Sequence, residues 1–319
     1  MELKSQARNP VPSGAVVGAF RGYDGQPLRF ARWDATQGPR RGTICLFHGR
    51  SEFIEKYFET IADLRRRGFA VATLDWRGQG ASFRRVHTHA QGHIDDFSEY
   101  ERDVVRFMKD VVLPDCPPPY IALAHSMGGN VMLRMASMRG CWFERMVLST
   151  PMIGIAATEL KHRTQLVRLY AELSVLCGFS TAFVHGGSDK LIGTGEFEGN
   201  PLTSDRERWT RNKAILEVAP QLGLASPTNG WLRAALRSCA KISAPNYARQ
   251  VNVPILLFAA GEDTIVSTPA IEEFGVRLKI GAPAHIAGAR HEILQERDRF
   301  RQKFWSAFDA YLGVSSAAA

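Results

Sequence analysis

The sequence predicts an α/β domain with a mostly parallel, doubly wound β-sheet. Short apolar runs alternate with helical segments in both the first and the last part of the chain, which is the pattern of repeated β-α-β units. A chain of 319 residues is long enough for one large domain of this class. Residues 151–251 show helical patterning without a clear strand, so we expect one helical insertion within the domain.

The first two strands form a predicted hairpin. Val17–Phe20 and Leu28–Trp33 flank the pair Asp24-Gly25, and Asp-Gly is a strong signal for a tight turn between antiparallel strands. Six further strands are expected, at 43–47, 70–74, 121–124, 145–149, 253–260 and 284–287. The resulting division is a core at 15–150 and 252–312, the insertion at 151–251, and flexible ends at 1–14 and 313–319.

One segment of the insertion carries an amphipathic helix. Apolar side chains recur there at three- and four-residue spacing, at Leu166, Leu169, Tyr170, Leu173 and Leu176. This spacing places them on one helical face. The face requires a partner, which is either the surface of the domain itself or an acyl chain or membrane.

Composition narrows the class of protein. The chain is 45% hydrophobic and 23% charged, as ordinary globular proteins are, and no apolar run is long enough to span a bilayer. The net charge of +8 favours peripheral contact with an anionic membrane, or it reflects solvated arginine on helix faces. No nucleic-acid-binding motif accompanies this charge, so we expect no nucleic-acid partner.

The N-terminal residues and the cysteines bear on the cellular compartment. Residues 1–10 contain no apolar core of the kind found in secretory signal peptides. The five cysteines are odd in number and lack paired spacing, which is typical of free thiols in a reducing environment. We therefore expect a cytoplasmic protein, with the inner membrane face as the site of any peripheral contact.

The most informative motif is a strand that turns directly into a helix around one serine. The buried strand 121–124 is followed by His125-Ser126-Met127-Gly128-Gly129, and a helical pattern begins at Asn130. The residues two positions before and after Ser126 are small, so strand and helix can approach closely. Such a turn forces the serine to positive φ and lifts its hydroxyl above the end of the sheet. This is the geometry of a nucleophile elbow; the alternative is an ordinary tight turn.

Four further motifs lie at the ends of predicted strands, in the order His48-Gly49, Asp75-Trp76-Arg77-Gly78-Gln79-Gly80-Ala81-Ser82, Gly261-Glu262-Asp263 and Gly288-Ala289-Arg290-His291-Glu292. With the serine turn, this order resembles the lysophospholipase and monoacylglycerol lipase branch of the α/β-hydrolase superfamily, over roughly residues 15–312. The resemblance implies an eight-stranded α/β-hydrolase fold with a helical lid after the sixth strand. It also implies a catalytic triad in the chain order Ser126, Asp263, His291. The loop at 75–82 is then a structural turn that braces its neighbours.

The base and the acid of the triad each have competitors. A serine hydroxyl needs a histidine within hydrogen-bond reach, and the resemblance favours His291, in a loop before the last helix. His285 falls inside a predicted strand, and His125 is expected to pack beneath the serine turn. The acid is Asp263 or Glu262; the resemblance favours Asp263 and leaves Glu262 solvated.

Two backbone N–H groups are expected to form the oxyanion hole. Met127 follows the serine at a helix start, and Arg50 follows His48-Gly49 in the loop after the third strand. The guanidinium of Arg50 either faces a phosphate or is solvated. We expect no cofactor and no metal, although His87, His89 and His93 have a spacing that a metal site could use.

These residues predict a serine carboxylic-ester hydrolase that cleaves a monoacyl lipid as a lysophospholipase or monoacylglycerol lipase. One alternative is a small-ester, thioester or lactone hydrolase with the same triad, and a second is a non-catalytic ligand-binding member of the fold. The run His48-Gly49-Arg50-Ser51-Glu52 lacks the His-Gly-Gly-Pro-Gly loop usual in the prolyl-aminopeptidase branch. A serine nucleophile also disfavours the aspartyl chemistry of dehalogenases and epoxide hydrolases.

Overall fold

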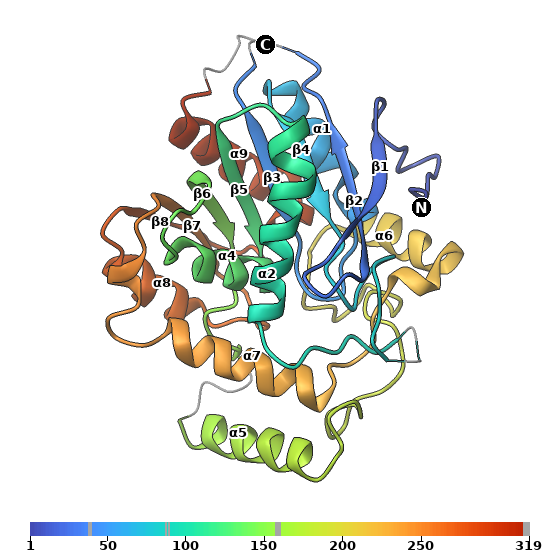
Figure 1. The fold of residues 1–319 in the computed structure, drawn as a ribbon, viewed down its shortest axis with the longest axis vertical. Coiled ribbons are helices and arrows are strands. Elements are labelled where there is room, and N and C mark those ends of the chain that lie inside the picture. Colours follow the sequence, from blue (N-terminus) through green and yellow to red (C-terminus); the bar gives the residue numbers. More distant parts are fainter. Residues whose placement is uncertain (38–39, 87, 89, 157–160, 315–319) are drawn as a thin grey trace.

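An eight-stranded sheet forms the centre of the molecule (Figure 1). The computed structural model describes residues 1–37, 40–86, 88, 90–156 and 161–314. The strands lie in the order β1-β2-β4-β3-β5-β6-β7-β8. Their bounds are β1 Val16–Arg21, β2 Pro27–Trp33, β3 Thr43–Phe47, β4 Ala70–Leu74, β5 Tyr120–His125, β6 Phe143–Ser149, β7 Ile255–Ala260 and β8 Gly281–Ile286. The predicted fold class and the predicted strands are confirmed.

The hairpin and the parallel part of the sheet follow from local sequence. β1 and β2 pair in antiparallel fashion, and Gly25 adopts φ +81° in the turn between them, a conformation that glycine tolerates best. β2 also pairs antiparallel to β4, whereas every pair from β4 to β8 is parallel. The carboxyl ends of the parallel strands therefore meet along one edge of the sheet.

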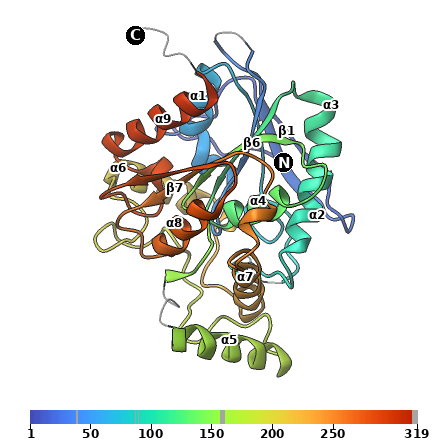
Figure 2. The ribbon, with the colours of Figure 1, turned by 90° about the vertical axis from the view of Figure 1, so that its left-hand side faces the viewer.

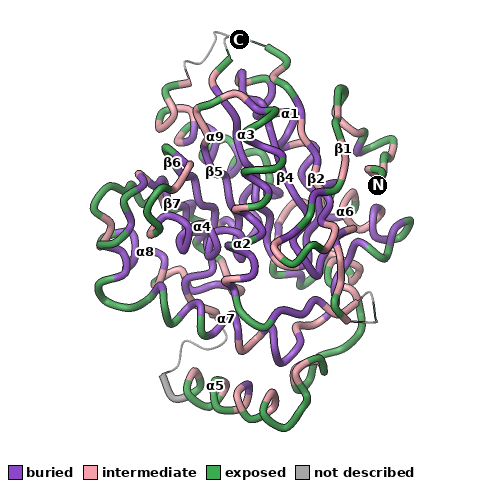
Figure 3. The backbone as a smooth tube through the Cα atoms, in the orientation of Figure 1, coloured by how far each residue is buried: buried purple, intermediate pink, exposed green. Residues whose placement is uncertain are grey.

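Helices cover both faces of the sheet (Figure 2). α1 and α9 pack on one face, while α2 and α4 pack on the other. The middle strands β3 and β4 are consequently buried at every position: along β3, Ile44 and Leu46 contact the first face, and Cys45 and Phe47 contact the second. Burial is concentrated in this central layer (Figure 3). The helix bounds are α1 Phe58–Arg66, α2 Ser98–Phe107, α3 Leu113–Asp115, α4 Met127–Ala136, α5 Lys161–Leu176, α6 Arg206–Val218, α7 Asn229–Ile242, α8 Thr268–Arg277 and α9 Asp298–Leu312.

A helical insertion separates β6 from β7 and contains α5, α6 and α7. α6 begins after Asp205, whose carboxylate accepts a hydrogen bond of 2.8 Å from the backbone N–H of Arg208. α7 begins after Thr228, whose hydroxyl accepts from Trp231 N–H. α5 packs against α7 at the end of the molecule away from the C-terminus (Figure 1).

The N-terminal segment differs from the expected flexible end. The segment 1–14 is tied to the core, where Asn9 Nδ2 donates to the Glu55 carbonyl oxygen, and to α6 of the insertion, where Gln6 Nε2 donates to the Ala214 carbonyl oxygen. Asn9 is buried. These contacts join distant parts of the chain, so the local composition of the segment gave no indication of them. At the other end, residues 313–314 are described and 315–319 lie outside the described residues.

Candidate active site

Ser126 lies at the sharp turn between β5 and α4. Its backbone adopts φ +52° and ψ −115°, a strained combination for a residue with a side chain. The turn requires glycine on its helical side: a Cβ on Gly128 would lie 2.5 Å from the Phe47 carbonyl oxygen, and one on Gly129 would lie 2.6 Å from Pro151. The local sequence therefore forces the serine hydroxyl to the carboxyl edge of the sheet.

Ser126, His291 and Asp263 form one hydrogen-bonded series. His291 Nε2 lies 2.9 Å from Ser126 Oγ, and His291 Nδ1 lies 2.7 Å from Asp263 Oδ2. The three residues follow β5, β8 and β7 respectively, so the parallel sheet brings together positions that are up to 165 residues apart. We call this series the triad. A hydroxyl that is hydrogen-bonded to one nitrogen of an imidazole can lose its proton to the ring, and a buried carboxylate at the other ring nitrogen supports this transfer.

The carboxylate of Asp263 is held in its ionised form. Burial alone would raise its pKa, but the nearby His291 ring and two backbone N–H groups keep the pKa below its usual value. These N–H groups belong to Ile265 and Val266, which donate to Oδ1 at 2.8 and 3.0 Å. Oδ2 therefore remains available to the imidazole.

The competing residues lie elsewhere. Glu262 is exposed. His285 is exposed on β8, where its Nδ1 lies 2.8 Å from Glu272 Oε1. His125 is buried beneath the turn, and its Nδ1 lies within hydrogen-bond distance of the Ser149 carbonyl oxygen and the Thr150 hydroxyl. Burial lowers the pKa of His125 to about 4, so its ring is neutral at physiological pH.

The loop after β3 lies directly against Ser126. A Cβ built on Gly49 would be 3.2 Å from Ser126 Cβ. The N–H groups on either side of Arg50 are engaged, since Gly49 N–H donates to Glu52 Oε2 and Ser51 N–H donates to Gln79 Oε1. Within the described part of the chain, the N–H groups of Arg50 and Met127 donate no hydrogen bond. Two unsatisfied backbone donors beside a serine hydroxyl are the components that an oxyanion hole needs.

The loop 75–82 braces this segment as expected. Asp75 is buried, and its carboxylate accepts hydrogen bonds from Ile54 N–H at 3.0 Å and Ala81 N–H at 2.8 Å. Gly80 packs so closely on this carboxylate that a Cβ would lie 2.2 Å away. The glycines of the motif thus serve close packing rather than phosphate binding.

A buried ion-pair network beneath the site was not predicted. Lys56 Nζ lies 2.9 Å from Glu52 Oε1 and 2.6 Å from Glu292 Oε1. Burial alone would lower the pKa of Lys56, but the two carboxylates raise it. Burial raises the pKa of Glu292. Burial would also raise the pKa of Glu52, but Lys56 together with His125 and His48 lowers it. The network joins the loop after β3 to the residue that follows His291. The i, i+4 spacing of Glu52 and Lys56 and the pair His291-Glu292 were the available sequence signals.

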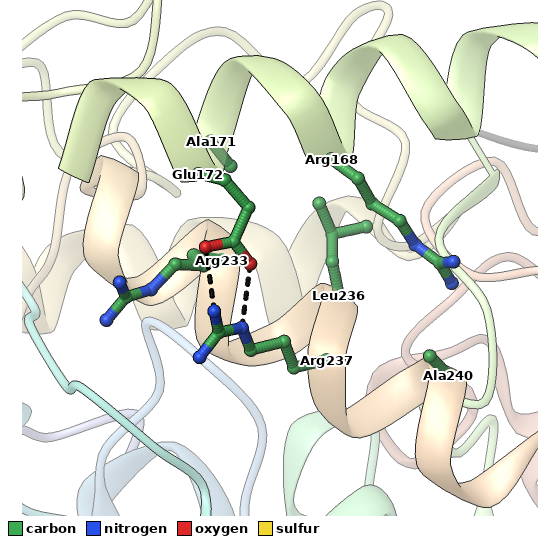
Figure 4. Close-up of a pocket in the computed structure, with 7 residues that line it drawn as sticks. All are labelled: Arg168, Ala171, Glu172, Arg233, Leu236, Arg237 and Ala240. Carbon is green, nitrogen blue, oxygen red and sulfur yellow. Dashed lines mark hydrogen bonds and ion pairs between the residues drawn. The ribbon is translucent and has the colours of Figure 1, made fainter. Parts of the chain in front are cut away.

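The remaining candidates are not part of the triad region. His93 bonds to Thr228 and Asp95, whereas His87 and His89 lie outside the described residues. No group of three or more potential metal ligands occurs among the residues that the structure describes. A hollow of about 130 Å³ lies between α5 and α7 (Figure 4). It contains the ion pair Arg237–Glu172, and all of its lining residues belong to α5 or α7, so no residue of the triad contributes to it.

The doubly wound sheet, the serine turn and the triad define an α/β-hydrolase. The chain belongs to the family described as serine aminopeptidase, S33, whose model matches residues 38–298. It is similar to lysophospholipase L2 of Escherichia coli (strain K12), with 31% identity over 88% of this chain and 83% of that protein. A probable lysophospholipase L2 of Haemophilus influenzae is 27% identical over 86% of this chain and 85% of its own length.

The fold is also similar to that of solved structures. A soluble variant of monoglyceride lipase from Saccharomyces cerevisiae, in complex with a substrate analogue, superimposes with a TM-score of 0.70. The match covers 93% of this chain and 96% of that chain, at 20% sequence identity. This likeness supports the fold class.

Proposed function

We propose that the chain is a serine hydrolase that cleaves the carboxylic ester of a monoacyl lipid through an acyl-enzyme. The observation that carries this proposal is the hydrogen-bonded triad, which ends on a serine hydroxyl beside two unsatisfied backbone N–H groups. Relatives named lysophospholipase L2 match most of the chain and support a lipid ester as the substrate. This chemistry requires neither a metal nor an organic cofactor.

Each residue of the site has a role in the proposed reaction. Ser126 Oγ bonds to the ester carbonyl carbon while His291 Nε2 takes its proton, and Asp263 holds the imidazole in the required tautomer. The N–H groups of Arg50 and Met127 stabilise the resulting oxyanion. The carbon–oxygen bond to the alcohol then breaks, and His291 returns the proton to the leaving oxygen. Water, deprotonated by His291, releases the fatty acid and regenerates Ser126.

The helical insertion is proposed to act as a lid whose exposed face meets lipid. Four leucines of α5 are exposed, with Leu166 at 64%, Leu169 at 56%, Leu173 at 50% and Leu176 at 78%. The domain surface therefore does not cover this stripe, and only its tyrosine is engaged, because Tyr170 hydroxyl donates to Asn229 Oδ1 at 2.8 Å. An acyl chain or membrane that covers several leucines gains several kcal/mol, at about 25 cal/mol per Å² of apolar surface.

Charge supports an anionic membrane as the surface on which α5 docks. The chain carries a net charge of +8, and α5 itself exposes Arg163 and Arg168. Basic residues next to an apolar helical face favour peripheral binding in the plane of the lipid headgroups. No helix in the described part of the chain is long and apolar enough to cross a membrane.

The decisive experiment combines active-site labelling with a substrate panel. A fluorophosphonate probe is expected to label the wild-type protein and not Ser126→Ala, since the probe reacts with an activated serine. Purified protein is then tested on lysophospholipids, monoacylglycerols and aryl esters of increasing chain length. Cleavage of monoacyl lipids supports the proposal. A short-chain optimum without lysolipid or monoacylglycerol cleavage would instead identify a small-ester hydrolase, and an unlabelled protein would identify a non-catalytic binding member of the fold.

A further inference from the structure

The side chain of Arg50 is a largely buried cation beside the triad, and it has no anionic partner among the residues that the structure describes. Its Nη1 donates to Ser51 Oγ at 2.9 Å, and its Nη2 donates to the Ala225 carbonyl oxygen at 2.8 Å. Its Nε is buried and has no hydrogen-bond partner among the described residues. A guanidinium has five N–H donors, so these two bonds leave most of its capacity free. The group also stacks on Trp231, 5.0 Å from the ring centre.

Two other buried arginines of the chain, Arg29 and Arg77, are neutralised by carboxylates. Arg29 lies 2.7 Å from Glu55 Oε1, and Arg77 forms an ion pair with Asp103. The group that interacts electrostatically with Arg50 is instead the phenol of Tyr100, and burial lowers the pKa of Arg50 to about 10. Arg50 therefore remains charged at neutral pH. Burial of a charge without a partner is unfavourable, and groups of this kind are concentrated at ligand sites.

The position of Arg50 matches the dimensions of a phosphate-bearing substrate. Residue 50 follows Gly49, and a Cβ built on Gly49 would lie 3.2 Å from Ser126 Cβ. The side chain of Arg50 therefore starts next to the nucleophile. Five bonds separate Cα from the guanidinium carbon, a reach of about 6 Å. In a 1-acyl glycerophosphate, six bonds separate the ester carbonyl carbon from phosphorus, or about 7 Å when extended. A carbonyl seated at the Arg50 N–H therefore leaves the phosphate within reach of the same residue.

We propose that the guanidinium of Arg50 binds the phosphate of a lysophospholipid and selects this substrate over an uncharged monoacylglycerol. The inference rests on the proposed ester hydrolase function and specifies the headgroup class. The planar guanidinium offers paired N–H donors to two phosphate oxygens, a contact that a monoacylglycerol lacks. The phosphate thereby supplies the missing counter-charge.

Substrate discrimination by Arg50→Gln tests this assignment. Wild type and variant are compared on a 1-acyl lysophosphatidylglycerol and a 1-monoacylglycerol with the same acyl chain, in the same detergent. We expect the ratio of kcat/KM values, lysophospholipid over monoacylglycerol, to fall by about ten- to a hundredfold, mainly through KM, because a charged hydrogen bond is lost. Arg50→Lys keeps the charge and should retain part of the ratio. Glycerol 3-phosphate should inhibit the wild type competitively and lose potency against Arg50→Gln.

Arg84→Gln is the matched control. Arg84 Nη2 also donates to carbonyl oxygens of the insertion, those of Gln221 and Gly223, so its loss loosens the insertion without removing a phosphate contact. We expect the ratio of kcat/KM values of Arg84→Gln, lysophospholipid over monoacylglycerol, to stay within about twofold of the wild-type ratio. A similar fall for both substrates in Arg50→Gln would show that Arg50 only fastens the insertion and would overturn the proposal. Inhibition of the wild type by inorganic phosphate, combined with an unchanged ratio of kcat/KM values in Arg50→Gln, would also overturn the proposal. A wild type inactive on both lipids would instead refute the hydrolase function itself.

Discussion

Lys56 and Glu292 form a buried ion pair, with Lys56 Nζ 2.6 Å from Glu292 Oε1. Glu292 follows His291, and Lys56 also pairs with Glu52, which accepts the N–H of Gly49. The segment that presents the histidine and the segment that presents the Arg50 N–H are therefore fixed to one shared ammonium group. The proposed base and the proposed oxyanion hole are therefore linked through this cation.

Removal of that cation should destabilise the protein. Lys56→Met leaves Glu52 and Glu292 as two buried carboxylates without a counter-charge, so the free energy of unfolding should fall by about 3 kcal/mol or more. Addition of Glu292→Gln removes one of these charges and should recover part of the loss. Urea denaturation checks both values. Lys109→Met serves as the control, because Lys109 is exposed. A double variant no more stable than Lys56→Met would contradict the network.

Ser126→Ala should abolish hydrolysis while the fold remains intact. The hydroxyl contributes little to packing, whereas loss of the nucleophile in a triad lowers turnover by several orders of magnitude. Circular dichroism and initial rates on a monoacyl lipid check the two halves of this expectation. Turnover above a few per cent of wild type would show that the nucleophile is another residue.

Asp263→Asn and Glu262→Gln form a second test of the site. Asp263→Asn should lower turnover by about a thousandfold or more, because an amide no longer holds the imidazole in the productive tautomer. Glu262→Gln should be nearly silent, since Glu262 is exposed. Steady-state kinetics of the two variants decides the assignment, and the reverse order of effects would move the acid to Glu262.

The leucine stripe of α5 can be tested without disturbing the triad. Leu169→Asp combined with Leu173→Asp should raise KM for long-chain monoacyl lipids and leave turnover of a short aryl ester nearly unchanged. Because both leucines are half exposed or more, the melting temperature should stay close to that of the wild type. Val276→Asp is the matched control, because Val276 on α8 is also highly exposed. Equal losses on both substrates would refute a role for the stripe in lipid binding.

The buried His125 should make the protein sensitive to acid. Its folded-state pKa is lowered from 6.5 to about 4 by burial, so between these pH values the unfolded chain binds more protons than the folded chain. Its contribution to stability is therefore complete above about pH 6.5 and decreases by about 3 kcal/mol as the pH falls to 4. His125→Asn keeps a donor at the Nδ1 position and cannot titrate. Its unfolding free energy should depend less on pH in this range, whereas His285→Gln should behave as the wild type does.

Local patterns sufficed for the strands and for the turn at Ser126, whereas the choice of Asp263 and His291 also needed the resemblance to a known family. The Asp24-Gly25 turn, the apolar strands and the small residues around Ser126 each impose a backbone conformation within a few residues, and a parallel sheet then brings strand ends to one edge. The Lys56–Glu292 pair, by contrast, joins residues 236 positions apart, and no short-range pattern encodes such a contact. The same holds for the anchored N-terminal segment and for the buried guanidinium of Arg50, whose surroundings come from the distant insertion.

The insertion between β6 and β7 also has a consequence for biosynthesis. Met146 to Ser149 pair in register with Ile255 to Phe258, so about a hundred residues must be synthesised between two neighbouring strands. Ser126 belongs to the first part of the sheet, whereas Asp263 and His291 belong to the last. When most of the message has been translated, the nascent chain on the ribosome therefore still lacks a complete triad. Non-local pairing of this kind is slow to form, and until it does, the open edge of β6 is a site where nascent chains can associate with each other.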